Sequence, residues 1–149
     1  MKEVVDLGLP SGTLWCKYNL GVNSNQLTKP EDWYGDYYAW GELEGNKTNE
    51  DGKIYFSWNN YKFGKNYKKL TKYCNSPEYG LNGFTDNLTE LLPEDDVAYQ
   101  NKHVGNFKFH IPTKEQCEEL INYTSNYWVN NYKGIKRLNG RMFEGKNGN

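Results

Sequence analysis

The residues of this sequence best suited to acid–base chemistry are two carboxylates at the ends of an aromatic stretch. In "YGDYYAWGE" (Tyr34–Glu42), Asp36 and Glu42 enclose three of the four rings. A glycosidase needs two carboxylates roughly 5–10 Å apart. If the stretch is extended, the six residue steps from Asp36 to Glu42 span about 20 Å. This spacing is too long for paired catalysis, and we interpret both acids as solvated or turn-capping.

A second group of acids could hold a metal ion. Glu94, Asp95 and Asp96 are consecutive and could offer oxygen ligands to calcium, although no EF-hand spacing is present. Acids at the positive end of a helix explain the run more simply, so calcium remains only an alternative and we expect no cofactor. His103 and His110 form no recognisable metal or triad pattern. These observations predict that the protein is not an enzyme.

Three cysteines are scattered along the chain, at Cys16, Cys74 and Cys117, without a C-x-x-C spacing. This pattern argues against a zinc site or a disulfide framework, and we expect reduced thiols, with a Cys16–Cys74 bridge as the alternative. No apolar run is long enough to span a membrane, and "MKEVVDLGLP" does not resemble a signal peptide. The expectation is synthesis in the cytosol, unless the chain is cut from a precursor.

Aromatic residues dominate the apolar composition, at 16% of the chain within a hydrophobic fraction of 36%. The core should therefore consist of few, large rings. If Asp36–Glu42 is a strand, alternation places Tyr38 and Trp40 with Asp36 on one face and Tyr37 with Ala39 on the other. One face should be core, and exposed Tyr and Trp on the other would be typical of a recognition surface. The candidate residues for ligand or partner binding are Tyr38, Trp40, Tyr55 and Trp58.

Charge gives no indication of a nucleic-acid partner. The chain has 18 basic and 19 acidic residues, for a net charge of −1. Lysines and aromatics do alternate in "NYKFGKNYKKLTKY", a pattern that can bind single-stranded nucleic acid. With a neutral chain, we interpret this segment as a lysine-rich loop.

The N-terminal half predicts short strands separated by turns. "EVVDLGLP" is prone to form a strand, Pro10–Gly12 is typical of a turn, and "TLWCKY" alternates as a second strand. "DYYAWGE", bounded by Gly35 and Gly41, is interpreted as another strand. The long region after it has no period and indicates a loop-rich fold anchored by aromatics.

Two helices are expected in the C-terminal half. "LPEDDVAYQNK" places Pro93 at the first helical position, and "IPTKEQCEELINYT" has Thr113 as N-cap with Gln116 completing a capping box. Helical spacing predicts that the second helix has one inward stripe, formed by Cys117, Leu120, Ile121 and Thr124. Cys117 should therefore be a buried packing residue.

The tail, "GIKRLNGRMFEGKNGN", is interpreted as a β-hairpin. Asn139-Gly140 is a strong signal for a two-residue turn, and Asn147-Gly148 is a second turn signal. The strand between them has no return strand, and an open edge invites pairing with another chain. We expect a protein partner or a second copy to complete the sheet at Arg141, Met142, Phe143 and Glu144.

Three segments together resemble one family. "VDLGLPSGTLW", "YGDYYAWGE" and "LTKYC…LPEDDVA…FHIPTKEQCEEL" are similar, in order and spacing, to the Fibrobacter succinogenes major paralogous domain, over most of residues 4–149. "IPTKEQCEEL" is also similar to an element of the formylglycine-generating and related C-type-lectin-like folds. Members of the family continue past the position of Asn149, so the resemblance implies a domain shortened at its C-terminus.

The resemblance implies one α+β domain over residues 1–149. The expected fold is C-type-lectin-like and loop-rich, with short antiparallel strands and one or two short helices. The family is abundant in surface proteins of gut Bacteroidetes and in their phages. The expected function is non-catalytic binding of a protein or glycan at a virion or extracellular surface, in a phage fibre or decoration protein. An exported bacterial adhesin domain is the alternative, and a glycan-acting enzyme is a further one.

Overall fold

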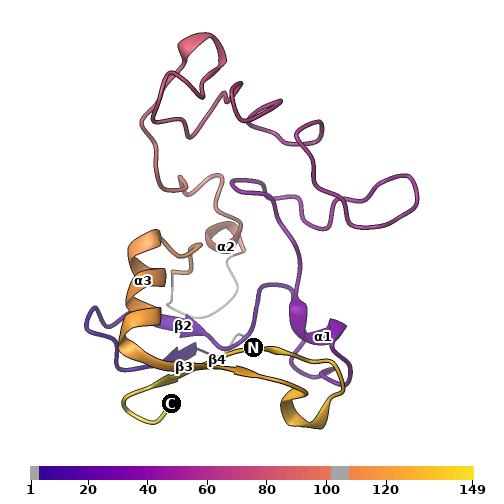
Figure 1. Ribbon diagram of the computed structural model, residues 1–149, viewed down its shortest axis with the longest axis vertical. Coiled ribbons are helices and arrows are strands. Elements are labelled where there is room, and N and C mark those ends of the chain that lie inside the picture. Colours follow the sequence, from indigo (N-terminus) through magenta and orange to yellow (C-terminus); the bar gives the residue numbers. More distant parts are fainter. Residues whose placement is uncertain (1–3, 102–107) are drawn as a thin grey trace. The chain divides into compact units, whose positions relative to one another are not determined.

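A computed structural model describes residues 4–101 and 108–149 (Figure 1). Contacts divide the chain into two compact units. Unit 1 comprises residues 1–36, 103–107 and 112–149, and unit 2 comprises residues 37–102 and 108–111. His103 lies outside the described residues. The expected single domain over residues 1–149 stays a prediction.

Unit 1 begins with two short paired strands. Strand β1 (Val4–Asp6) pairs antiparallel with β2 (Leu14–Cys16), and Gly12 N donates to Leu9 O at 2.9 Å within the connecting turn. The predicted strand–turn–strand is therefore confirmed. The connection also supplies the two buried leucines that form the core of unit 1 with a third leucine from the C-terminal part of the chain: Leu7, Leu9 and Leu120.

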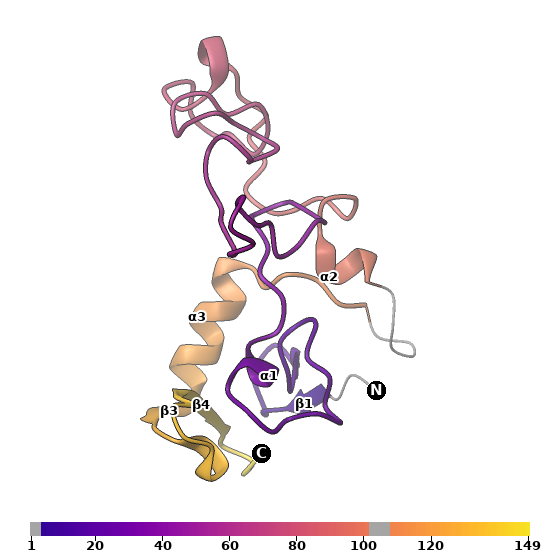
Figure 2. The same ribbon diagram turned by 90° about the vertical axis from the view of Figure 1, so that its right-hand side faces the viewer.

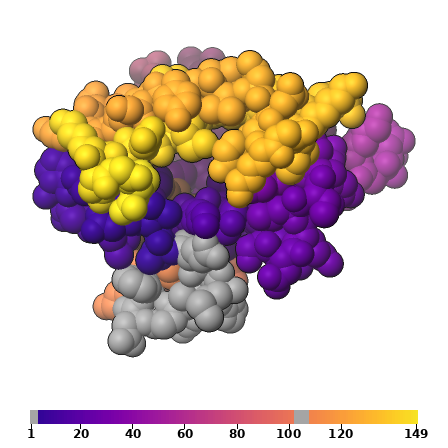
Figure 3. Space-filling model, turned by 90° about the horizontal axis from the view of Figure 1, so that it is seen from below, coloured from indigo at the N-terminus to yellow at the C-terminus, as the bar shows by residue number. Residues whose placement is uncertain are grey.

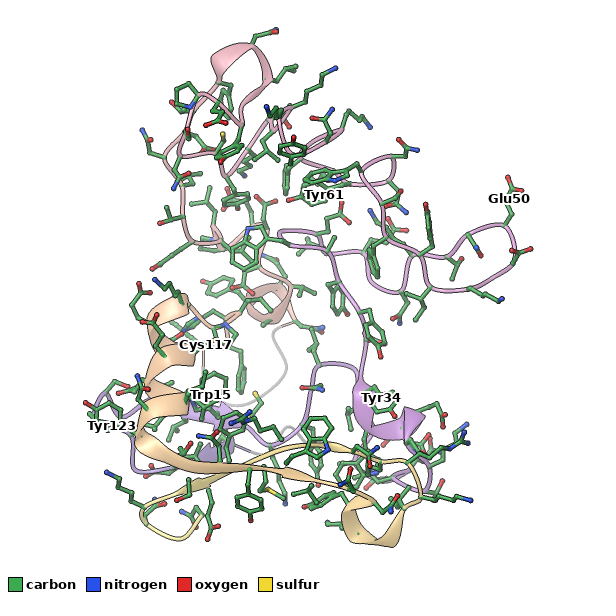
Figure 4. The ribbon with its side chains drawn as sticks, in the orientation of Figure 1. Trp15, Tyr34, Glu50, Tyr61, Cys117 and Tyr123 are labelled. Atoms are coloured by element: carbon green, nitrogen blue, oxygen red, sulfur yellow. The ribbon has the colours of Figure 1, made fainter. Side chains whose placement is uncertain are left out.

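Helix α3 (Lys114–Tyr123) begins with the predicted capping box. Thr113 Oγ1 accepts from Gln116 N, while the Gln116 side chain accepts from Thr113 N at 3.0 Å. The predicted inward stripe is wrong in part: Leu120 and Thr124 are buried, whereas Cys117 and Ile121 are exposed. The core of unit 1 is a few leucines wide, so only one line of the helix reaches it. Figure 4 shows Cys117 on this helix, above Trp15.

The second sheet of unit 1 corrects the predicted tail hairpin. Strand β4 (Gly140–Gly145) pairs antiparallel with β3 (Thr124–Val129), which directly follows α3, and not with residues 134–138. The Arg141–Glu144 strand is therefore confirmed, but its partner was predicted wrongly. Asn139-Gly140 is not a two-residue turn, because the Asn139 side chain accepts from Asn131 N and closes a wide connection. This connection contains the 3₁₀ turn η2 (Tyr132–Gly134).

The second turn signal of the tail, Asn147-Gly148, is confirmed. Gly148 has φ of 84° and donates to Gly145 O at 2.9 Å. The turn folds the end of the chain onto β1, where the Asn147 and Asn149 side chains donate to Asp6 O at 2.9 and 2.8 Å.

Part of the aromatic stretch is a helix end and not a strand. Helix α1 (Glu31–Tyr34) ends at Gly35, whose φ is 72°. A Cβ at this glycine would lie 2.3 Å from Leu20 O, so no other residue fits this close approach. Asp36 N then donates to Leu20 O at 2.8 Å. The predicted strand over Asp36–Glu42 is wrong, because glycines with positive φ bend the chain at each end of it.

Unit 2 is built mainly of turns and isolated bridges, with η1 (Leu81–Gly83) and α2 (Val97–Gln100) as its helical turns. Helix α2 starts later than predicted, so Pro93 is not its first residue. Its N-cap is Asp96, whose carboxylate accepts from Ala98 N and Tyr99 N at 2.9 and 3.0 Å. Pro93 instead lies in the turn that Asp95 N closes on Leu92 O.

The described elements confirm an α+β protein with short antiparallel strands and few helices. Among the residues that the structure describes, no helix combines the length and apolar character needed to cross a membrane.

Glu119 should be the main polar link between α3 and the β1–β2 connection. Its carboxylate accepts from Ser11 N at 2.8 Å and from Ser11 Oγ at 2.7 Å. Replacing Glu119 by Ala should lower the free energy of unfolding by about 2 kcal/mol, as expected for charged hydrogen bonds. Urea denaturation measures the change. The neighbouring Glu118→Ala removes only a surface pair with Lys114 and should have little effect; equal losses in both variants would contradict this role of Glu119.

Candidate functional site

A row of aromatic rings forms the centre of unit 2. The rings of Trp58, Tyr61, Phe63 and Tyr73 meet edge to face in that order, with centroids 5.7, 6.0 and 5.5 Å apart. This arrangement is favoured by the ring quadrupoles. Phe63 is buried in the row, and Gly41 packs on it with φ of 75°. A Cβ at Gly41 would lie 2.9 Å from the Phe63 ring, so the glycine permits the contact.

Glu42, the last residue of the aromatic stretch, is buried beside this row. It is only 3% exposed, and its carboxylate pairs with Lys47 Nζ at 2.5 Å and accepts from Lys62 N at 2.5 Å. The interpretation of Glu42 as a solvated or turn-capping acid is therefore wrong. A buried carboxylate requires such partners, because desolvation without them is costly. Asp36, the other acid that flanks the aromatic stretch, belongs to unit 1.

Lys47 connects this carboxylate to the loop that carries Tyr55 and Trp58. Its ammonium also donates to Asn60 O at 2.7 Å, and Tyr55 N donates to Lys47 O at 2.7 Å. The Asn60 side chain closes the loop, because it donates to Tyr55 O and accepts from Ser57 N, both at 2.9 Å. We call Glu42, Lys47 and Asn60 the polar frame.

The polar frame supports three exposed rings, Trp40, Tyr55 and Trp58, which we call the aromatic patch. They are 45%, 52% and 42% exposed. Tyr61 joins the two tryptophans, because its hydroxyl donates to Trp40 O at 3.1 Å and its ring contacts that of Trp58. Figure 4 shows Tyr61 among the aromatic side chains of unit 2.

Tyr38, the fourth candidate binding residue, has a different environment. It is half-buried, and it forms an isolated bridge with Gly45, whose Cα packs against the Tyr38 ring. Tyr37 is exposed. The predicted alternation of faces is absent here because the segment is not a strand, and the turn from Ala39 to Glu42 redirects Trp40.

A second buried carboxylate, Asp95, holds the turn before α2 against the aromatic row. It accepts from Lys62 Nζ at 3.1 Å and from Tyr73 Oη at 2.8 Å, and it pairs with Lys72. Burial opposes ionisation of Asp95, but the hydrogen bonds from Lys72, Tyr73 and Lys62 outweigh it and hold its pKa below the usual value. Bonding to Asp95 in turn raises the pKa of Lys72.

The three consecutive acids therefore have separate structural roles. Glu94 is exposed, with Lys72 at 3.9 Å. Asp95 binds the lysines, and Asp96 caps α2 while accepting from Ile111 N at 2.9 Å. Within residues 4–101 and 108–149, no group of His, Cys, Asp or Glu is arranged to hold a metal ion. The calcium alternative stays a prediction.

Another carboxylate, Asp86, organises the backbone around Cys74. It accepts from Tyr73 N, Cys74 N and Leu88 N at 2.8, 2.9 and 3.1 Å. Burial alone would raise the pKa of Asp86, but these hydrogen bonds outweigh that effect and hold the pKa below its usual value. Cys74 is buried and donates to Ser76 O, and none of the three cysteines forms a disulfide; Cys16 and Cys117 are exposed. The expected burial of Cys117 is wrong, and the alternative Cys16–Cys74 bridge is not formed.

Sequence reasoning does not identify Lys47, Asn60 or Asp86. The only available signal is that Asn and Asp side chains readily bond nearby backbone in turns, as "WNNY" and "FTDN" suggest. Such a signal is common in loops, so it does not distinguish these residues from other polar residues. The ion pair of Lys47 with Glu42 has no local signature.

The proposed partner-facing residues of β4 point in different directions. Phe143 packs against the leucine core, and Met142 is half-buried. Arg141 and Glu144 are exposed, and Arg141 Nε donates to Asn126 Oδ1 of β3 at 2.8 Å.

No family model, curated protein or solved structure matches this chain. The resemblance to the Fibrobacter succinogenes major paralogous domain therefore stays a prediction.

Replacing Glu42 by Gln should destabilise unit 2, because Lys47 would keep a largely buried charge without its partner. The expected loss of unfolding free energy is about 3 kcal/mol, as for other broken buried pairs. Tryptophan fluorescence during urea denaturation measures it. Glu44→Gln, two residues away at an exposed position, is the matched control. If Glu42→Gln loses no more unfolding free energy than Glu44→Gln, the Glu42–Lys47 pair does not stabilise the loop.

The Asp95 cluster should make unit 2 sensitive to acid. Since the folded-state pKa of Asp95 lies below the ordinary 3.8, its contribution is complete above that pH and is lost as the pH falls through the folded-state value. Asp95→Asn should be less stable than the parent chain at pH 7, and the difference should narrow below about pH 4. Urea denaturation across pH 2–7 measures this, with Glu94→Gln as control. A difference that does not change with pH would contradict the assignment.

Proposed function

We propose that this chain is a non-catalytic binding module whose aromatic patch holds a protein or glycan partner. The observation that carries the proposal is the exposure of Tyr55 and Trp58, on a loop whose polar atoms are bonded internally, and of Trp40, whose backbone oxygen accepts from Tyr61. Large exposed rings are enriched where proteins recognise partners, and tryptophan and tyrosine are frequent binding hot spots.

The polar frame supports this proposal because it reduces the cost of binding. A flexible loop loses conformational entropy when it meets a partner, at about 0.5–1.5 kcal/mol for each side chain that is immobilised. In unit 2, the Asn60 side chain already fixes the backbone around Tyr55 and Ser57, and Trp58 rests edge to face on Tyr61. The patch is thus organised before a partner arrives.

The environments of the acids favour binding over hydrolysis. Glu42 is engaged with Lys47 and Lys62, and Asp95 with Lys62, Lys72 and Tyr73. A glycan-acting enzyme would need a pair of carboxylates that both reach the substrate. These two are held inside unit 2 by their bonds, so their role is structural.

The biological setting is a proposal from the sequence resemblance. The resemblance supports a C-type-lectin-like fold and a surface protein of the Bacteroidetes or of their phages. We favour a virion component, such as a fibre or decoration protein, over an exported adhesin domain. In both settings the domain lies at a surface, so the aromatic patch can contact a partner.

Removing the rings of the patch should weaken binding without unfolding the protein. Trp40→Ala and Trp58→Ala should each weaken binding to host-cell envelopes or to an arrayed glycan panel at least tenfold, a typical loss for an aromatic hot spot of about 2 kcal/mol. Tyr67→Ala is the control, because Tyr67 is an equally exposed aromatic of unit 2 in a separate turn. Biolayer interferometry measures binding and circular dichroism verifies folding.

Two results would contradict the proposal. One is equal binding by the parent chain and both folded tryptophan variants. The other is turnover of a glycan that Glu42→Gln abolishes in a folded protein, which would instead support the enzyme alternative.

A further inference from the structure

Three Asn-Gly pairs occur in the chain, at Asn82-Gly83, Asn139-Gly140 and Asn147-Gly148. In such a pair the backbone nitrogen of the glycine can attack the side-chain amide carbon of the asparagine, because glycine has no Cβ to hinder the approach. The reaction needs an asparagine side chain that can turn toward the backbone and a glycine nitrogen that can leave its hydrogen bond. The three pairs differ in both conditions.

The side chain of Asn147 is held at both of its polar atoms. Its Nδ2 donates to Asp6 O at 2.9 Å, and its Oδ1 accepts from Asn149 N at 3.3 Å. The nitrogen that would attack is bonded as well, because Gly148 N donates to Gly145 O at 2.9 Å. Figure 3 shows the yellow C-terminal residues against the indigo N-terminal residues. Attack on Asn147 Cγ therefore requires the C-terminal turn to leave the N-terminal segment.

Asn139 is held in the connection between β3 and β4. Its Oδ1 accepts from Asn131 N at 3.0 Å. Gly140 is the first residue of β4 and lies opposite Val129 in the ladder. Bringing Gly140 N to the Asn139 side chain would disturb both the closed connection and the start of the strand.

Asn82 is far less restrained. It is exposed in η1, which Figure 2 shows as the pink turn at the end of a loop of unit 2, and its side chain forms no hydrogen bond with the residues that the structure describes. φ is 53° at Asn82 and 79° at Gly83, as in a type I′ turn, which Phe84 N closes on Leu81 O at 3.1 Å. Gly83 N donates to Gly80 O at 3.2 Å, at the long end of ordinary N–H···O distances. Only this small turn must open for Gly83 N to reach Asn82 Cγ.

We propose that Asn82 is the site of spontaneous deamidation in the folded protein. Gly83 N forms a bond to Asn82 Cγ, the Cγ–Nδ2 bond breaks, and the side-chain nitrogen leaves as ammonia with the proton that Gly83 N gives up. Water then adds to either carbonyl carbon of the cyclic imide and opens it, to leave aspartate or isoaspartate at this position. The net reaction consumes water and releases ammonia, so it needs no oxidant or cofactor.

Both products change η1. Each places a carboxylate where the uncharged amide was, and isoaspartate also adds a carbon atom to the backbone between Leu81 and Gly83. The loop is too tight to absorb this atom unchanged, because a Cβ at Gly80 would lie 1.8 Å from Phe84 O. The modification therefore alters the shape of the turn as well as its charge. It involves no residue of the polar frame or the aromatic patch, so this proposal is independent of the proposed function.

Ageing of the full chain in mildly alkaline buffer, followed by peptide mapping with mass spectrometry, tests the proposal. Asn82 should deamidate about tenfold or more faster than Asn139 and Asn147, because these two must first break local hydrogen bonds. In concentrated urea the three pairs should react at similar rates, since each then has only its glycine neighbour. Equal rates at the three pairs in the folded chain, or an Asn82 that stays intact while the unfolded chain reacts, would overturn the proposal.

Labelling by an isoaspartyl methyltransferase gives a second measurement that does not depend on the peptide map. The aged parent chain should accept the label, and Asn82→Gln should lose most of it. Asn59→Gln is the matched control, because it makes the same substitution at an exposed asparagine of unit 2 that does not precede a glycine. Circular dichroism verifies that both variants are folded. Equal labelling of the parent chain and a folded Asn82→Gln would contradict the assignment.

Discussion

Unit 2 depends on carboxylates that are buried among lysines and backbone amides. Its buried apolar residues are few, Phe63, Cys74 and Val97 among those described, and its described residues form no extended strand ladder. Glu42 and Asp95 hold the loops together in place of a larger apolar core, because each binds donor groups from separate parts of the loop region. A charge inside a protein is stabilising only when its partners are fixed. The two buried carboxylates therefore fix the positions of Lys47, Lys62 and Lys72. These lysines in turn fix the loops that carry them.

The aromatic row and the carboxylates work together. Lys62 Nζ lies 4.6 Å and Lys72 Nζ 5.5 Å from the centre of the Phe63 ring. Each ammonium thus meets a carboxylate and the face of a ring, and both contacts attract a cation. Tyrosine is suited to this setting because its ring packs while its hydroxyl bonds, as Tyr73 does with Asp95 and Tyr61 with Trp40 O. The high tyrosine content of the sequence is explained in part by this use.

Sequence reasoning succeeded where the signal was local. Thr113 and Gln116 are three residues apart, and their capping box depends on nothing else in the chain. It failed where distant residues decide the structure. Strand β3 directly follows α3, so no turn residue marks its start in the sequence. Its pairing depends on β4. In the sequence, Glu42 resembles a surface acid. Its burial is evident only in the structure, where it contacts Lys47 and Lys62.

The bonds from Asn147 and Asn149 to Asp6 join positions 141 and 143 residues apart. They determine the order in which the protein can form during synthesis. Unit 2 takes all of its residues from positions 37–111, so its ion pairs can assemble while the rest is still being made. Unit 1 is completed only when residues of the C-terminal part of the sequence have been made, because they bond to the end of β1. Until then, the leucines beside β1 lack their core partner Leu120.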